Sequence, residues 1–183
     1  MKRVPTSVFA GVGLTLLMAS GAAFALPSTP DLGKAEAQCR PGESGPAFIV
    51  DVVGLKNRTG RLKLEVYPPT DADFLGDDNK LIPEGKTFRR VEVQVPATGT
   101  PRLCVRLPRP GTYTMMVLHD TNSNRKFDLS HDGIAFSNNP KLGWSKPKAS
   151  VVATTAGPGL TPLRVVMNYR RSLLSVGPIG DVH

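Results

Sequence analysis

The sequence predicts an all-β protein folded as an antiparallel β-sandwich of about seven or eight strands. Short segments alternate apolar and polar residues with a period of two, and turns containing Gly or Pro separate them. No segment has a convincing helical period, and internal repeats are absent from the sequence. The expected strands are 47–55, 61–67, 88–95, 102–107, 112–119, 133–137, 149–155 and 161–170.

The alternation also assigns faces to the expected strands. In 61–67 the apolar residues are expected to point inward and the charged residues outward; these are Leu62, Leu64 and Val66 against Arg61, Lys63 and Glu65. The segment 112–119 is apolar on both faces, which is typical of an interior strand. The stretch 68–86 interrupts the pattern and is interpreted as a surface excursion anchored by Phe74 and Leu75.

The N-terminus has the features of a secretory signal peptide over residues 1–25. Lys2 and Arg3 precede an apolar run at 8–17, and residues 23–25 form an A-x-A cleavage site. The run is too short for the alternative, a membrane anchor, and no later run is long enough to span a bilayer. We therefore expect a periplasmic or secreted protein with no transmembrane anchor after cleavage. The mature chain should comprise an extended leader (26–46), one β-sandwich domain (47–170) and a loosely ordered tail (171–183).

The chain is basic, with a formal charge of +8. Removing residues 1–25 takes away two of the 23 basic residues and none of the 15 acidic ones, which leaves +6. The basic residues are dispersed and are not interleaved with aromatic residues, so the composition argues against nucleic-acid binding. The sequence identifies no specific partner. A solvated basic surface is expected instead, and envelope components such as anionic lipids or polysaccharides are one class of partner that it could attract.

Cys39 and Cys104 are the only cysteines, and in an oxidising compartment they are expected to form a disulfide. Cys104 shares a strand face with Arg102 and Arg106, so it is placed to reach a segment outside the sheet. The bond would stabilise the fold by about 4 kcal/mol. The alternative is two free thiols. A metal site is disfavoured because no other Cys or His lies at ligand spacing.

The loop after the strand 112–119 is dense in oxygen-bearing side chains. The spacing is typical of a calcium loop, with side-chain oxygens two residues apart and one peptide oxygen, that of Lys126. The candidate ligands are Asp120, Asn122, Asn124, Lys126, Asp128 and Asp132. Arg125 replaces the glycine of an EF-hand-like loop, so only weak Ca²⁺ binding is expected. The alternative is a loop whose Asp and Asn side chains bond their own backbone. No cofactor is expected to be required.

No catalytic residue is predicted. His119-Asp120 and Ser130-His131-Asp132 contain the residue types of a nucleophilic triad, but triad members come from separate segments. The sequence also lacks a nucleophile elbow and an HExxH helix. A hydrolase is therefore less favoured than either a structural or binding module or a carrier of a small apolar ligand.

Several short motifs resemble the bacterial domain-of-unknown-function family 2141. The resemblance covers about 48–169. The residues that carry it are PGTY (110–113), VLHD (117–120), the loop residues Asn122, Asn124, Lys126 and Asp128, DG (132–133), FSNN (136–139) and NY (168–169). The resemblance implies an exported β-sandwich of the immunoglobulin or prealbumin kind, and it marks His119, Ser137, Asn138 and Asn139 as motif residues. The family pattern has glycines where this chain has Ser123 and Arg125.

Two readings of the Ser137-Asn138-Asn139 motif remain open. It forms either a recognition or ion-proximal surface, or a turn whose side chains satisfy buried backbone near His119. Taken together, the sequence favours a non-catalytic exported structural or binding module of the bacterial cell envelope, with weak Ca²⁺ binding in the Asp/Asn loop. The alternative is a carrier of a small apolar ligand between the sheets.

Overall fold

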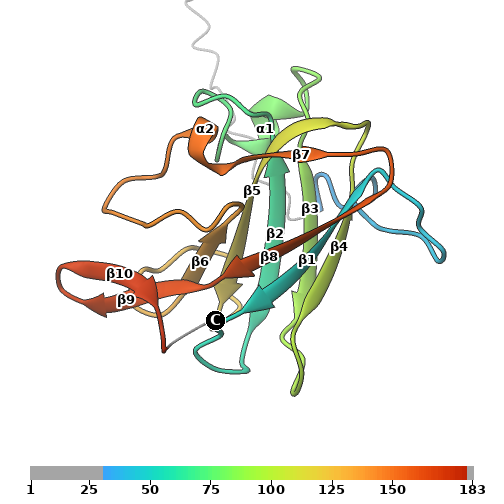
Figure 1. The fold of residues 1–183 in the computed structure, drawn as a ribbon. Coiled ribbons are helices and arrows are strands. Elements are labelled where there is room, and N and C mark those ends of the chain that lie inside the picture. Colours follow the sequence, from blue (N-terminus) through green and yellow to red (C-terminus); the bar gives the residue numbers. More distant parts are fainter. Residues whose placement is uncertain (1–30, 181–183) are drawn as a thin grey trace, which may run out of the picture.

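The computed structural model describes residues 31–180, so the predicted signal peptide and residues 26–30 of the predicted leader lie outside the described residues. The described part is almost entirely β-structure (Figure 1). Its elements are β1 (Ala47–Val53), β2 (Arg61–Tyr67), α1 (Asp78–Leu81), β3 (Arg89–Gln94), β4 (Arg102–Arg106), β5 (Gly111–Asp120), β6 (Gly133–Phe136), α2 (Ala149–Val152), β7 (Ala153–Ala156), β8 (Leu160–Val166), β9 (Asn168–Ser172) and β10 (Ser175–Pro178).

The strands form two sheets, which confirms the predicted β-sandwich. The smaller sheet has the order β4-β1-β8, and the larger has the order β10-β9-β6-β5-β2-β3, with β7 also pairing with β5. All strand pairs are antiparallel except β1 and β8, which run parallel from Ala47↔Leu160 to Val53↔Val166. A long connection separates β1 from β8 in sequence, and parallel pairing requires such a connection.

The core lies between the two sheets and follows the predicted alternation. Leu62, Leu64 and Val66 of β2 have no exposed surface, and Val165 and Met167 are equally buried. Phe48 of β1 packs against Tyr113 of β5 in an edge-to-face arrangement, with ring centroids 6.2 Å apart. Burial of these side chains on both inner faces is the main stabilising term of a sandwich.

A second apolar cluster covers the outer face of the larger sheet. The excursion 68–86, which carries α1, and the segment around α2 pack over this face (Figure 1). Phe74 is fully buried there, where its ring meets those of Tyr67 and Phe136 edge to face, which confirms the interpretation of the excursion. Met116 and Leu118 face this cluster while Met115 and Val117 face the core. This second layer explains why β5 is apolar on both faces.

The same layer buries one charged residue of the outer face. Glu65 points outward from the core as predicted, but it is only 3% exposed because the second layer covers this face. Its carboxylate accepts from Arg90 Nε at 2.7 Å and from Tyr67 Oη at 2.6 Å. Arg90 Nη2 in turn lies 3.0 Å from Asp78 Oδ2 in α1. A buried charge is tolerated only when it is paired and hydrogen-bonded, and this network supplies both.

Burial of Glu65 disfavours its charged form, but Lys63 and Arg90 outweigh burial, and the pKa of the carboxyl lies below its ordinary value. Burial likewise opposes the charge of Arg90, and Glu65 and Asp78 hold its pKa above the ordinary value. Glu65 and Arg90 are therefore both charged at neutral pH. Their contacts with each other and with Asp78 fasten the excursion to β2 and β3.

Three local predictions are corrected. Residues 149–152, expected in a strand, form helix α2, and the strand begins at Ala153. Residues 171–178, expected to be loosely ordered, complete the hairpin β9–β10, in which Tyr169 pairs with Gly177. The leader was expected to be extended, but residues 31–37 form turns, in which the Ala37 amide donates to the Lys34 carbonyl at 3.1 Å. Ala37 is buried, and its carbonyl accepts from the Arg106 amide at 2.8 Å. Within 31–180, neither helix is long and apolar enough to cross a bilayer.

Candidate functional site

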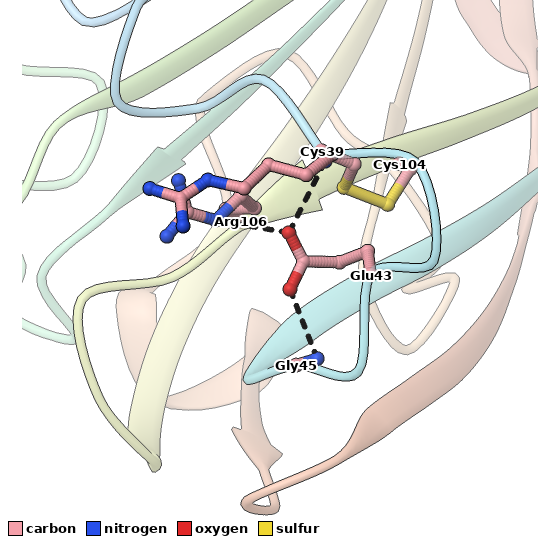
Figure 2. The surroundings of a disulfide bond; sticks show 6 residues. Cys39, Glu43, Gly45, Cys104 and Arg106 are labelled. Atoms are coloured by element: carbon pink, nitrogen blue, oxygen red, sulfur yellow. Dashed lines mark hydrogen bonds and ion pairs between the residues drawn. A yellow bond between two sulfur atoms is a disulfide. The ribbon is translucent and has the colours of Figure 1, made fainter.

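The predicted disulfide joins Cys39 of the leader to Cys104 of β4, with Cα atoms 5.9 Å apart (Figure 2). Glu43 fixes the loop that follows Cys39. Its carboxylate lies 2.9 Å from Arg106 Nε and accepts from the Gly45 amide at 3.1 Å. The Gly45 amide, followed by the Arg40 amide and the Arg106 charge, holds the pKa of Glu43 below its ordinary value. The leader is thus attached to β4, the edge strand of the smaller sheet, with which Gln38 also forms a backbone bridge at Val105.

In the Asp/Asn loop, side-chain oxygens accept bonds from the loop's own backbone. Asp120 Oδ1 accepts from the Asn124 amide at 3.1 Å, and its Oδ2 accepts from the Arg125 amide at 2.7 Å. Asp132 Oδ1 accepts from the Thr121 amide at 3.0 Å, and its Oδ2 accepts from the Asp128 amide at 2.9 Å. Both carboxylates are buried. They therefore hold the two ends of the loop together.

The remaining candidate ligands make shorter-range bonds. Asn122 Oδ1 accepts from the Asn124 amide, Asn124 Oδ1 accepts from the Lys126 amide, and Asp128 Oδ1 accepts from Ser130. These contacts are the Asx turns of the alternative interpretation. Among residues 31–180, no group of three or more His, Cys, Asp or Glu side chains is placed to share a metal ion. An ion in this loop would compete with backbone donors for the carboxylate oxygens.

Two residues of the loop have the left-handed backbone conformation that favours glycine. Ser123 has φ 58° and Arg125 has φ 64°. These are the positions at which the family pattern has glycine, so the chain keeps the backbone path of the loop without the residue best suited to it.

His119, at the end of β5, is fully buried and hydrogen-bonded through both ring nitrogens. Nε2 lies 2.9 Å from the Thr59 carbonyl, and Nδ1 lies 2.6 Å from Tyr169 Oη. A carbonyl can only accept, so Nε2 carries the proton and Nδ1 accepts from the Tyr169 hydroxyl. Tyr169 Oη accepts in turn from the Lys56 amide at 3.1 Å. Every donor and acceptor in this chain of contacts has a partner.

The environment keeps both side chains neutral. Burial lowers the pKa of His119 below its ordinary value, and the Thr59 carbonyl offsets part of this effect. Burial raises the pKa of Tyr169 to about 12. His119 has no exposed surface through which a substrate could reach its ring.

Gly133 is the residue that makes room for Tyr169. A Cβ atom built on Gly133 would lie 2.3 Å from Cε1 of the Tyr169 ring, far inside van der Waals contact. The DG and NY motifs are therefore linked sterically, because Gly133 of the first leaves the space that the Tyr169 ring of the second occupies. Sequence spacing gave no signal for this relationship.

The side chains of Ser137, Asn138 and Asn139 bond backbone groups of the crossover that follows β6. Ser137 Oγ donates to the Val152 carbonyl. Asn138 Nδ2 donates to the Val151 and Ala153 carbonyls at 3.1 and 2.8 Å. These contacts hold α2 and the start of β7 beside the end of β6.

Asn139 extends the same pattern to β8. Its Nδ2 donates to the Arg164 carbonyl at 2.9 Å, and its Oδ1 accepts from the Val166 amide at 2.8 Å. The backbone groups that the motif satisfies thus belong to α2, β7 and β8, whereas the contacts of His119 are Thr59 and Tyr169. The structure places the two motif groups in separate networks.

An open groove of about 530 Å³ lies beside the disulfide, where β3 and β4 form the edges of the two sheets. Its charges are paired within the chain. The Glu92 carboxylate lies 2.9 Å from Lys34 Nζ and 3.9 Å from Arg61. Arg102 makes a bidentate contact with Asp51 at 2.6 and 2.9 Å.

The family comparison agrees with the motifs that these contacts explain. The family described as "Uncharacterized protein conserved in bacteria (DUF2141)" matches residues 50–161. The chain belongs to this family. The DUF2141 match includes His119, Gly133 and Ser137–Asn139, while Cys39 and Tyr169 lie outside it. Neither a curated protein nor a solved structure matches the chain significantly.

Proposed function

We propose that this member of DUF2141 is an exported, non-catalytic structural or binding module of the bacterial cell envelope. The observation that carries the proposal is the use of the family's polar motif residues. His119, Asp120, Asp132 and Ser137 are buried, and each is bonded to backbone or, for His119, also to Tyr169. A catalytic group must reach a substrate, and these groups are engaged in holding loops and crossovers in place.

The disulfide supports the exported location. Structural disulfides persist in oxidising compartments and are rare in the bacterial cytosol. The bond fastens the leader to β4 across a sequence separation of 65 residues. A closure of this length stabilises a fold by about 4 kcal/mol, and this contribution is made only where the bond can form.

The hydrolase hypothesis receives no support from the described contacts. Ser130 Oγ donates to Asp128, and Asp132 binds the Thr121 and Asp128 amides. Ser130 and Asp132 are therefore hydrogen-bonded to Asp128 and Thr121, and these contacts do not link the two side chains to the His131 ring. The interior between the sheets is filled by closely packed side chains with little or no exposure, which also argues against a ligand carried there.

Fractionation of a cell that produces the tagged full chain tests the proposal. We expect the protein in the periplasmic or extracellular fraction, with an N-terminus at Leu26 and with cysteines that resist alkylation until a reductant is added. A cytosolic protein that keeps residue 1 and alkylates at both cysteines would contradict export.

Catalysis is tested separately with chromogenic esters, phosphate esters and glycosides. Turnover that disappears in a folded His131→Ala variant would contradict the non-catalytic role. His131 is the appropriate target because it is exposed, whereas replacing buried His119 would perturb the fold.

A further inference from the structure

Most of the net positive charge of the chain comes from residues 133–180, because this stretch has no acidic residues to balance its basic ones. Residues 133–180 contain six basic residues and no Asp or Glu. The basic residues are Lys141, Lys146, Lys148, Arg164, Arg170 and Arg171. Within residues 31–180, Lys141, Lys148, Arg170 and Arg171 form no salt bridge with the chain, and all four are exposed. Their charges are available to an external anionic partner.

The same region exposes large apolar side chains. Trp144 is 59% exposed in the loop before α2, and Leu173 and Leu174 are 77% and 83% exposed at the tip of the β9–β10 hairpin. Phe127, at the end of the Asp/Asn loop, is 50% exposed. Isolated exposed apolar residues are normal, but a group of them on neighbouring loops marks an interaction surface.

A shallow pocket of about 220 Å³ shows that these loops are neighbours. It is lined by Phe127 from the Asp/Asn loop, by Leu142 and Trp144 from the loop before α2, and by Val176 from β10. Ile134 and Phe136 of β6 also line it. In Figure 1 the loop before α2 and the β9–β10 hairpin project from the same side of the molecule.

One lysine holds this surface to the rest of the fold. Lys146 Nζ donates to the Phe74 carbonyl at 2.9 Å and to the Asp71 carbonyl at 3.1 Å. The Asp71 carboxylate accepts from the Ala149 amide at 2.6 Å. These bonds attach both ends of the 146–149 segment to the excursion, so Trp144 is presented on an anchored loop.

We propose that this surface, formed by the loop before α2, Phe127 and the β9–β10 hairpin, docks on an anionic phospholipid bilayer. This inference rests on the proposed export, which places the protein next to envelope membranes. Aromatic and aliphatic side chains at loop tips partition into the lipid interface, and flanking Lys and Arg side chains bind acidic headgroups. Leu173 and Leu174, flanked by Arg170 and Arg171, combine both features at one hairpin tip.

Two observations favour a bilayer over other occupants. The hairpin tip lies outside the pocket lining, so a single amphiphile held in the pocket would leave Leu173 and Leu174 exposed. A second copy of this chain would bring together two surfaces that carry the unpaired Lys141, Lys148, Arg170 and Arg171, which like-charge repulsion disfavours. An anionic membrane covers the apolar tips and neutralises the basic residues at the same time.

Trp144 is the only tryptophan and reports directly on docking. With the purified protein and vesicles of phosphatidylglycerol and phosphatidylcholine, we expect a blue shift of its emission, quenching by brominated acyl chains, and co-sedimentation. Binding should weaken as the ionic strength rises from about 0.05 to about 0.5 M, because salt screens headgroup attraction. Pure phosphatidylcholine vesicles should bind at least about tenfold more weakly.

Matched variants separate docking from folding. Leu173→Ser with Leu174→Ser, and Lys141→Glu with Lys148→Glu, should each lower vesicle affinity by about tenfold or more. Leu160→Ser on β8 and Arg40→Glu with Arg109→Glu on other exposed loops should change it less than about twofold. Equal losses in the test and control variants, at equal thermal stability, would overturn the proposal.

Three further outcomes would also overturn it: no vesicle binding at low salt, a Trp144 shift caused by monomeric lysolipid without vesicle binding, or a concentration-dependent shift without lipid. The vesicle measurement does not depend on cell location. Failure of export in the fractionation experiment and failure of docking are therefore distinguishable.

Discussion

Nδ1 of His119 lies 2.6 Å from the phenolic oxygen of Tyr169, fifty residues further along the chain. The contact joins the end of the central strand β5 to β9, which pairs with β6 and carries the β10 hairpin. The Lys56 amide completes it from the β1–β2 connection. Three segments far apart in sequence therefore meet at the Tyr169 hydroxyl group. Removing this hydroxyl measures directly how much its contacts contribute to the free energy of unfolding.

Tyr169→Phe should lower the free energy of unfolding by about 1–3 kcal/mol, because it leaves His119 Nδ1 buried without a donor. Denaturant unfolding at pH 7.5 measures the loss. Tyr113→Phe is the matched control, since Tyr113 Oη donates to the Arg109 carbonyl in a less buried turn, and it should cost about 1 kcal/mol or less. Equal losses of unfolding free energy in the two variants would show that the His119 contact stabilises the fold no more than the Tyr113 contact does.

The lowered pKa of His119 predicts that stability falls in mild acid. The folded state holds the imidazole neutral, while in the unfolded chain it titrates near 6.5. Below about pH 6.5 the unfolded state therefore binds more protons, and stability decreases as the pH falls toward the folded pKa. Unfolding measured from about pH 7.5 to about pH 5 should show this slope.

His119→Gln supplies the control for the pH measurement. It removes the titrating group, so the variant should be less stable at pH 7.5 but should have a shallower slope between about pH 6.5 and about pH 5. An unchanged slope in His119→Gln would assign the acid sensitivity to other groups.

Gly133→Ala should destabilise the fold by about 2–4 kcal/mol, because the new methyl group overlaps the Tyr169 ring. Gly177→Ala on β10 is the control: its Cβ would meet Arg171 Cδ at an ordinary 3.6 Å. A Gly133→Ala, Tyr169→Ala double variant should lose less than the sum of the single effects. Additive losses would indicate that the two residues do not interact.

Ser123→Gly should stabilise the protein by about 0.5–1 kcal/mol, because Ser123 occupies the left-handed region at φ 58°. The shift in thermal midpoint is the measurement. Ser145→Gly, at an exposed loop position whose φ is not positive, should be neutral or destabilising. Stabilisation by both substitutions would point to a general effect of glycine in loops.

Ca²⁺ binding in the Asp120–Asp128 loop should be no tighter than about 10⁻⁴–10⁻³ M, because an ion must replace backbone donors on Asp120 and lies near two basic residues. Isothermal calorimetry decides the affinity, and Asp128→Asn serves as the comparison. Micromolar binding that Asp128→Asn abolishes would show that the loop rearranges around the ion.

The sequence by itself determined the sandwich, the inward face of β2 and the pairing of Cys39 with Cys104. These features follow from period-two alternation and from the chemistry of single residue types, both of which are local properties of a strand. The Asx-turn interpretation of the Asp/Asn loop is local as well, since most of its bonds span two to five residues.

Only the tertiary structure decided what covers the other side of each strand. Alternation shows that Glu65 and Leu64 point to opposite faces of β2. It cannot show that the excursion 68–86 buries Glu65 against Arg90 and Asp78. It also cannot pair His119 with Tyr169, or Gly133 with the same ring. Such contacts depend on which distant segments come together in the folded chain, and the spacing of residues in the sequence does not show which segments these are. The sequence pattern therefore identifies the polar motif residues, whereas the structural role of each residue depends on its contacts in the folded chain.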